Sequence, residues 1–160
     1  MKSPKIVASI TTAVSLALAP SVAQAAGPSQ PLTAAATAKP SVDDRGKKVV
    51  KHARKQLGVR YKTGSSNPRH GLDCSGLVVH TYRKVGVKLP HQSSAIRKSS
   101  KTRVIPRHKA KPGDIIWSPG HVAIFTGKGK VVEAARGFKQ KGVTERRVWQ
   151  RPPTFLRVAG

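Results

Sequence analysis

The chain contains one cysteine, Cys74, among its 160 residues. A lone cysteine cannot form an internal disulfide, which excludes a scaffold held together by disulfides within the chain. Its thiol is therefore free for other chemistry. The plain alternative is a small buried hydrophobic residue, since free cysteine is among the most buried residue types. The sequence around Cys74 distinguishes between these two interpretations.

Acidic and aromatic residues are also scarce. Six Asp and Glu face 31 Lys and Arg, which gives a formal net charge of +25. Such an excess attracts polyanions without specifying which ones. Aromatic residues make up only 4% of the chain, so stacking platforms for single-stranded nucleic acid are few. The sequence shows no helix-turn-helix or zinc-finger spacing, and nucleic acid is therefore a disfavoured partner.

Long apolar runs are nearly absent, and the one candidate lies at the start of the chain. Residues 6–19 are almost wholly apolar or small, but a membrane-spanning helix needs about 20 such residues. Lys2 and Lys5 precede this run, and Ala23-Gln24-Ala25 follows it as an A-x-A cleavage pattern. These features predict a secretory signal peptide over residues 1–25. Loss of its two lysines would lower the formal charge from +25 to +23.

The remaining sequence divides by composition. Residues 26–43 are rich in Ala, Pro, Ser and Thr and have too few large apolar side chains to form a core, which predicts a flexible linker. Residues 44–160 suit one small domain. No other run is long enough to span a membrane, so we expect a mature protein without a transmembrane segment. The short linker and the lack of a recognisable second domain suggest a monomer.

The predicted domain changes its hydrophobic period part way along. Asp44 is a candidate cap for a first helix ending near Leu57, and Gly58 is a natural stop. Gly, Ser, Asn and Pro over residues 59–72 predict a loop. Two further helices are predicted at 73–86 and 92–99, and five short strands at 114–118, 121–126, 130–135, 142–149 and 155–158. Helices followed by strands predict an α+β fold, with N-terminal helices packed on an antiparallel sheet.

Cys74 is expected in the first turn of the second helix, with Asp73 as its cap. A thiol becomes a good nucleophile when it ionises, and the free N–H groups and positive dipole end of a helix N-terminus stabilise a thiolate. The same N–H groups can hold the oxyanion that forms when a thiolate attacks a carbonyl. The position of Cys74 therefore favours a chemical role.

A catalytic thiolate needs an imidazolium partner. His121 begins a predicted strand directly after the Ser118-Pro119-Gly120 turn, where it can project from the sheet edge toward a helix terminus. The other five histidines are less suitable: His52 and His80 are predicted on outward helix faces, and His70, His91 and His108 fall in loops or basic segments. No His or Cys pair has H-x-x-x-H or C-x-x-C spacing, so a metal site is not indicated.

Glu133 is the best candidate for a third group that orients the imidazole. It lies in an otherwise apolar strand, where an unpaired carboxylate would be costly. The alternative is a solvent-facing Glu133 paired with a surface lysine. A three-residue hairpin loop at 127–129, or an equivalent bulge, places Ala123 opposite Glu133 and His121 on the same face. A two-residue loop would turn Glu133 to the other face, and we predict the first arrangement.

These residues carry a resemblance to the NlpC/P60 family of cell-wall cysteine peptidases, in the papain-like superfamily, from about residue 46 to 150. The segments that match the family pattern are Asp73-Cys74-Ser75-Gly76-Leu77-Val78, Gly113-Asp114-Ile115-Ile116-Trp117, His121-Val122-Ala123-Ile124-Phe125 and 127–134. Two segments depart from it. Tyr61-Lys62-Thr63-Gly64-Ser65 stands where the family often has Tyr-x-Trp-Gly-Gly, and His91 stands where it usually has Arg after Leu-Pro.

The resemblance implies roles for five residues. Cys74 would be the nucleophile, His121 the base and then the acid, and Glu133 the group that orients His121. Tyr61 would contribute a hydroxyl near the thiolate and the oxyanion, where Ser75 is also expected. The resemblance implies no metal or organic cofactor.

The implied reaction is hydrolysis of an amide bond in peptidoglycan stem peptides by a secreted, wall-associated endopeptidase. The implied bond joins D-γ-glutamyl to a diamino acid, either meso-diaminopimelate or lysine. The basic surface suggests anionic wall polymers as further partners. Three alternatives remain open at the level of sequence. The first is an N-acetylmuramoyl-L-alanine amidase or other amide or ester hydrolase on this scaffold, and the second is a non-catalytic cationic protein that binds the wall or another polyanion. The third is an antibacterial effector with the same chemistry, released against competitors.

Overall fold

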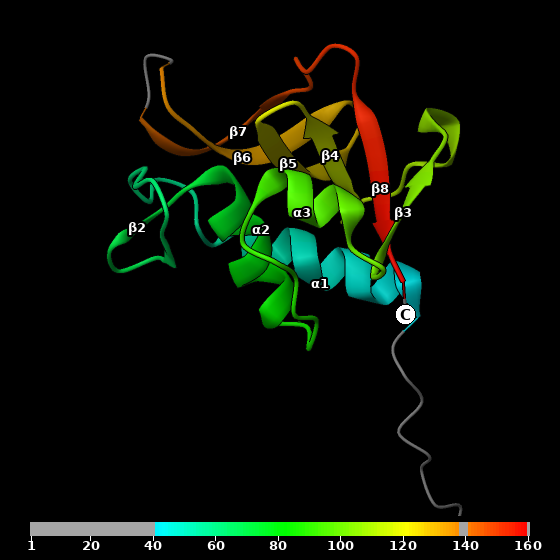
Figure 1. The fold of residues 1–160 in the computed structure, drawn as a ribbon, viewed down its shortest axis with the longest axis horizontal. Helices are drawn as coiled ribbons and strands as arrows, with labels where there is room; N and C mark the ends of the chain where they lie inside the picture. The colour runs from blue at the N-terminus through cyan, green and yellow to red at the C-terminus, as the bar shows by residue number, and fades with distance from the viewer. Residues whose placement is uncertain (1–40, 138–140, 160) are drawn as a thin grey trace, which may run out of the picture. The chain divides into compact units, whose positions relative to one another are not determined.

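The computed structural model describes residues 41–137 and 141–159. The predicted signal peptide, and the predicted linker as far as residue 40, lie outside the described residues. The last three residues of that linker do not form linker: they belong to the first helix and its cap. Figure 1 labels the helices and strands of this C-terminal unit.

The first helix, α1 (Val42–Arg54), begins three residues earlier than predicted, and its cap is Ser41 rather than Asp44. The Ser41 hydroxyl accepts a hydrogen bond from the Asp44 N–H at 3.1 Å and donates one to the Asp44 carboxylate at 2.8 Å. Asp44 therefore lies in the first turn, where its charge also favours the positive end of the helix dipole. The chain turns after Arg54, and Gly58 adopts a positive φ of 83° where the prediction placed the stop.

Two more helices follow as predicted, α2 (Cys74–Arg83) and α3 (Ser93–Lys98). The segment between α1 and α2 is not wholly irregular, because it contains a short antiparallel hairpin of β1 (Ser66–Asn67) and β2 (Gly71–Leu72). This hairpin packs against α2. A single 3₁₀ turn, η1, covers Arg107–Lys109.

The sheet of this unit has six strands in the order β3-β8-β4-β5-β6-β7, and every neighbouring pair is antiparallel. Its strands are β3 (Thr102–Ile105), β4 (Ile115–Ser118), β5 (His121–Gly127), β6 (Lys130–Ala135), β7 (Gly142–Arg147) and β8 (Thr154–Val158). Five of them match the predicted strands to within two residues at each end. The sixth, β3, was not predicted. The α+β architecture with helices on an antiparallel sheet is confirmed.

The two faces of the sheet bury different side chains. One face packs on α1, α2 and α3, and its core combines helical Leu77, Val78 and Ile96 with sheet residues such as Ile124 and Leu156. Figure 1 shows α1 and α2 together on this side of the strands. A smaller cluster on the other face joins Ile105, Ile116, Ala123, Val131 and Phe155. The alternation of Ile115 and Ile116 between the clusters follows from the two-residue period of a strand.

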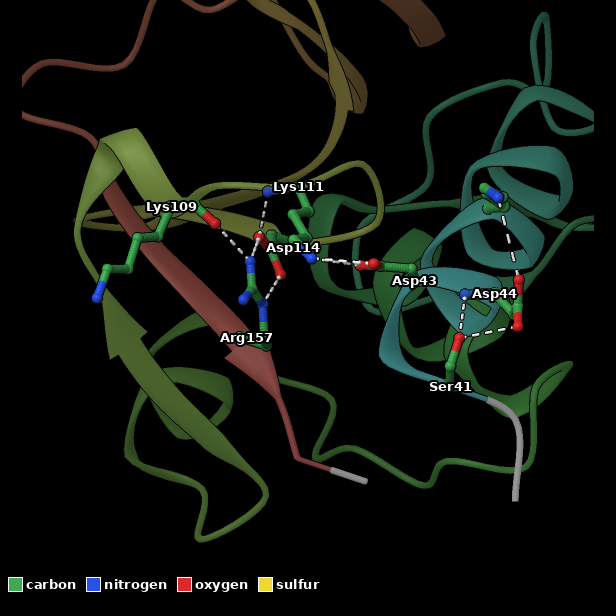
Figure 2. Close-up of polar contacts among 8 residues, drawn as sticks. Ser41, Asp43, Asp44, Lys109, Lys111, Asp114 and Arg157 are labelled. Carbon is green, nitrogen blue, oxygen red and sulfur yellow. Dashed lines mark hydrogen bonds and ion pairs between the residues drawn. The ribbon is translucent and has the colours of Figure 1, made fainter. Parts of the chain in front are cut away.

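A buried carboxylate, Asp114, joins the start of β4 to β8 (Figure 2). Arg157 donates to both of its oxygens, at 2.9 and 2.7 Å, and the Lys111 N–H donates at 2.7 Å. Arg157 also donates to the Lys109 carbonyl, and the Lys111 ammonium pairs with Asp43 at the start of α1. The Gly-Asp pair of the β4 motif is thus a structural junction, and the bidentate geometry is the strongest kind of carboxylate contact.

Within the residues that the structure describes, no helix has the length and apolar character needed to cross a membrane.

Candidate active site

Cys74 is the first residue of α2 and is partly buried. Asp73 caps the helix as predicted, accepting from the Gly76 N–H at 2.6 Å and from the Ser75 hydroxyl at 3.0 Å. The N–H groups of Cys74 and Ser75 have no acceptor within the helix, because the carbonyls four residues before them precede the first turn. The thiol therefore lies at a helix end with donors available for an anion.

The loop that carries Tyr61 is tied to the same cap. Asp73 accepts from the Gly64 N–H at 2.6 Å, and the Asp73 N–H donates to the Ser65 carbonyl at 3.0 Å. Ser65 also explains the glycine two residues after the nucleophile, since a Cβ at Gly76 would lie 2.0 Å from the Ser65 carbonyl oxygen. The motif residues Asp73 and Gly76 thus hold the loop against the helix end.

His91 supplies a further contact to Asp73, with its Nε2 3.1 Å from the carboxylate. Burial alone would raise the Asp73 pKa, but hydrogen bonds from Gly76, His91 and Ser75 outweigh it and lower that pKa. Asp73 therefore stays ionised beside Cys74, with its charge directed at donors of the cap and loop. The residue after Leu89-Pro90, a departure from the family pattern, here supports the nucleophile's cap.

His121 and Glu133 meet across β5 and β6. These strands pair Phe125 with Val131 and Ile124 with Val132, and the register shifts between Phe125 and Gly127. The turn itself has two residues, Lys128 and Gly129, but the bulge before it supplies the extra residue and is the predicted equivalent of a three-residue loop. Continuing the register places Ala123 opposite Glu133, so His121 shares its face as expected. The imidazole Nε2 lies 2.7 Å from the Glu133 carboxylate.

Glu133 is fully buried, with 0% of its surface exposed, and has several donors besides His121. The Trp149 indole N–H lies 2.8 and 3.0 Å from its two oxygens, and the Gln150 amide donates at 3.2 Å. Arg146 adds an ion pair at 3.6 Å. The Trp149 ring also packs 5.5 Å from the His121 ring, centroid to centroid. A buried carboxylate needs such compensation, and here the donors fix its orientation as well.

Opposing influences set the His121 pKa. Burial lowers it, but hydrogen bonds with Cys74 and Glu133 and their negative charges outweigh burial and raise it to about 9. Because Nε2 faces Glu133, Nδ1 is the ring nitrogen left for Cys74. The imidazole is therefore placed between a thiol and a buried carboxylate, and the imidazolium form is favoured at neutral pH.

Tyr61 lies near the thiol, on the loop side. Burial raises its pKa first, and the charges of Cys74 and Asp73 raise it further, so its hydroxyl stays protonated and able to donate. The Ser75 hydroxyl is buried and bonded to Asp73. A role for Ser75 at an oxyanion would therefore belong to its main-chain N–H.

One histidine prediction was wrong. His80 was expected on the outer face of α2 but is 7% exposed, because the β1–β2 hairpin covers that side of the helix. Burial lowers its pKa, with smaller contributions from Lys84 and Arg83.

Three residues of the site, Trp149, Gln150 and His91, were not predicted to take part in it. Among the described residues, no cluster of three His, Cys, Asp or Glu side chains could hold a metal ion.

Comparison with known proteins finds relatives that match part of this chain. The chain is 30% identical over 106 aligned positions to murein DD-endopeptidase MepH of Escherichia coli (strain K12), covering 60% of this chain and 39% of that protein. It is 34% identical over 99 positions to gamma-DL-glutamyl hydrolase of Bacillus subtilis (strain 168), covering 57% and 24%. The chain thus spans well under half the length of these two curated relatives.

A solved structure shows the fold at similar identity. The P60 domain of M. avium subspecies paratuberculosis antigen MAP1204 superposes with a TM-score of 0.62 at 28% identity, covering 73% of this chain and 96% of that one. The family model described as NlpC/P60 matches residues 58–156, which contain Tyr61, Cys74, His121 and Glu133. That span is more than half of the chain, and the chain belongs to the NlpC/P60 family.

Proposed function

We propose that this chain is a cysteine endopeptidase that hydrolyses an amide bond in peptidoglycan stem peptides. The proposal rests on three groups that meet at one site. Cys74 lies at a helix N-terminus with His121 beside it, and the buried Glu133 carboxylate lies 2.7 Å from the imidazole. A thiol, an imidazole and an orienting carboxylate are the parts of nucleophilic acyl transfer. Both curated relatives described above are named as hydrolases of peptide or glutamyl bonds.

In the proposed mechanism the Cys74 thiolate attacks the scissile carbonyl carbon while His121 is imidazolium. The N–H groups of Cys74 and Ser75 and the Tyr61 hydroxyl are the donors available to the oxyanion. His121 then gives its proton to the leaving amine as the C–N bond breaks. The neutral imidazole next takes a proton from water, whose oxygen attacks the thioester, and the carboxylic acid product leaves as the thiol is restored.

Glu133 supports this cycle by holding the imidazole and compensating its positive charge. Its own position is fixed by Trp149 and Gln150, so it contributes through His121 rather than by touching substrate. The hydrolysed bond is proposed to join D-γ-glutamyl to meso-diaminopimelate or lysine. The names of the relatives span DD-endopeptidase and gamma-DL-glutamyl hydrolase, and the choice of bond is therefore the part most in need of a test.

Digestion of purified peptidoglycan and defined muropeptides, read by mass spectrometry, tests the proposal. The protein should release products with new γ-glutamyl carboxyls and diamino-acid amines, and Cys74→Ala should release none. New amines at the muramoyl-L-alanine position instead would assign the alternative amidase activity. Intact muropeptides with both proteins, under reducing conditions and across pH, would contradict the proposed hydrolysis.

The same proposal places the protein outside the cell, in contact with the wall. Its support is the substrate class of the relatives and the predicted signal peptide. Detection of the processed chain in wall and medium fractions, starting at residue 26, would test export directly. Recovery of the full-length chain from the cytoplasm alone would contradict it.

A further inference from the structure

All six carboxylates of the chain lie in the described residues, and each has a partner there. Those partners are Lys111 for Asp43, Ser41 and Lys47 for Asp44, His91 for Asp73, Arg157 for Asp114, His121 for Glu133 and Arg54 for Glu145. With 31 Lys and Arg in the chain, the positive charge of the remaining surface has no carboxylate of its own to neutralise it. Where that charge meets a hollow in the surface, it attracts and concentrates anionic ligands.

Such a hollow lies between α1 and the tip of the β5–β6 hairpin. Two adjoining spaces of about 560 and 590 Å³ share Arg54, Pro112 and Thr126 in their walls. Lys47, Lys51 and Lys55 line the first, and Lys128 and Lys130 line the second. We call this combined space the α1–hairpin groove.

The lysines of the groove come from two regular arrangements. Lys47, Lys51 and Lys55 are spaced four residues apart, which sets them on one side of α1 and of the turn that ends it. Lys128 occupies the hairpin tip with a positive φ of 50°, beside Gly129 at 67°. A two-residue turn of this type prefers Asn or Gly at its first position, so a lysine there is held at a steric cost. The turn presents its ammonium at the end of the groove.

The cations of the walls suit a row of phosphates along a polymer. Arg54 is the groove's one guanidinium, and Glu145 already engages it at 2.8 and 3.3 Å. Glu145 also accepts a hydrogen bond from the Thr126 hydroxyl. The remaining cations are lysines, which bind phosphates as point charges and require no fixed bidentate geometry. Between them lie apolar surfaces of Pro112, Phe125 and Ala110, against which uncharged segments of a polymer can rest.

The groove is separate from the candidate active site. His121 begins β5 and Gly127 ends it, and a seven-residue strand is about 20 Å long. A polymer in the groove would therefore contact the hairpin tip and α1 while leaving Cys74 and His121 open. A bound polymer and a stem peptide can occupy the protein together.

We propose that the α1–hairpin groove binds a linear, phosphodiester-linked anionic polymer of the cell wall. A concave groove with charges on both walls fits a flexible strand better than a flat lipid surface. Aromatic stacking is the usual means of holding single-stranded nucleic acid, and the groove's one aromatic residue, Phe125, is half-buried against Phe155. The site does not depend on the proposed hydrolysis, although the source of the polymer is taken from the family's association with the wall.

The test measures binding of the purified chain to poly(glycerol phosphate) across a range of salt concentrations. The groove variant replaces Lys51, Lys55, Lys128 and Lys130 with Gln, and the control variant replaces Lys84, Lys88, Lys98 and Arg103 with Gln. Both lose four charges at exposed positions. We expect the groove variant to bind at least tenfold more weakly, with its salt slope reduced by about three for four lost phosphate contacts. The control variant should change binding less than threefold.

Three outcomes would overturn the proposal: equal losses in the two variants, no binding of poly(glycerol phosphate) by the unaltered chain, or tighter binding to anionic vesicles or an oligonucleotide than to the polymer. Replacement of the four groove lysines with Arg should restore binding, which excludes a folding defect as the cause of the loss. Cleavage of a soluble muropeptide should be the same in all variants. Failure of that cleavage in every variant would contradict the proposed function and leave the groove result standing.

Discussion

Two buried carboxylates organise this domain, and they differ in the chemistry of their main partner. Asp114 is held by the guanidinium of Arg157, which stays charged at every accessible pH. Glu133 is held against the imidazole of His121, which can gain and lose a proton and has a pKa raised to about 9, and against Trp149 and Gln150. The first arrangement can only hold strands together. The second arrangement can hold the imidazole ring in place while the ring gains and loses a proton.

The largest expected effect comes from Glu133→Gln. The substitution keeps the volume but removes the charge that compensates imidazolium, and its amide would oppose the donors of Trp149 and Gln150. A comparable change in a catalytic triad costs about 10⁴ in kcat. We expect muropeptide cleavage to fall by about 10³-fold or more. A variant that keeps more than a tenth of the activity would show that Glu133 does not orient His121.

Asp114→Asn should give the opposite pattern. It leaves Arg157, whose side chain is 12% exposed, without its charged partner. Removing one member of a buried pair costs about 3–5 kcal/mol of unfolding free energy. Urea denaturation should show this loss, while kcat measured on the folded protein at low temperature stays within about threefold of the original, an allowance that is under 1 kcal/mol. A large drop in kcat with unchanged stability would break the distinction between the two carboxylates.

The pH dependence of stability separates the sites further. The His121 pKa is about 9 in the folded protein, above its ordinary value of 6.5, so the protonated ring stabilises the fold. That contribution is complete below about pH 6.5 and is lost as pH rises through 9; the shift corresponds to at most about 3 kcal/mol. The hydrogen bond with Asp114 raises the Arg157 pKa, so that pair does not titrate between pH 6.5 and 9.

Urea midpoints between pH 6 and 9.5 measure this dependence. The original protein should lose stability over that range relative to His121→Gln, which lacks the titrating ring. Parallel curves for the two proteins would contradict the raised pKa. NMR titration of the imidazole provides a direct check, with a lower pKa expected in both Cys74→Ala and Glu133→Gln, because each removes an interaction that raises it.

The smallest effect is expected from Trp149→Phe, which retains an aromatic ring beside His121 but removes the N–H that Glu133 accepts. Loss of one hydrogen bond to a charged group is worth about 1.5 kcal/mol, or about a tenfold fall in kcat with little change in KM. Trp117→Phe is the matched control, since no acceptor for the buried Trp117 N–H is present among the described residues. It should leave kcat and stability unchanged or raise stability slightly. Equal kcat losses in the two variants would remove Trp149 from the site.

The parts of the site on regular elements could be predicted from sequence. Asp73 and Cys74 follow from helix-capping preferences, and the shared face of His121 and Glu133 follows from strand alternation once the hairpin register is known. Trp149 and Gln150 were missed because they follow β7 in an irregular segment, and no sequence period specifies where such a segment directs its side chains. A signal did exist: Glu133 in an apolar strand requires donors, and Trp carries one.

The misses in the fold have similar causes. Strand β3 escaped prediction because it is an edge strand: Arg103 and Val104 are exposed, and Ile105 is its one buried residue. His80 was assigned to the outer face of α2 from helical periodicity alone. Periodicity describes one helix and cannot report that the β1–β2 hairpin, formed from a loop-like sequence, covers that face. Both errors concern contacts between elements rather than the elements themselves.

The close approach of Ser65 to Gly76 has a consequence for how this domain can be re-engineered. The Ser65 carbonyl fills the space where a side chain at residue 76 would lie, and the Gly64 and Ser65 main chain bonds to Asp73. Turns from other family members could therefore be exchanged at residues 68–70, between the two strands of the hairpin, with the cap left in place. An exchange that moves residues 64 and 65 would displace the helix cap and, with it, the thiol, so tolerance to loop exchange ends at the residues that bond to Asp73.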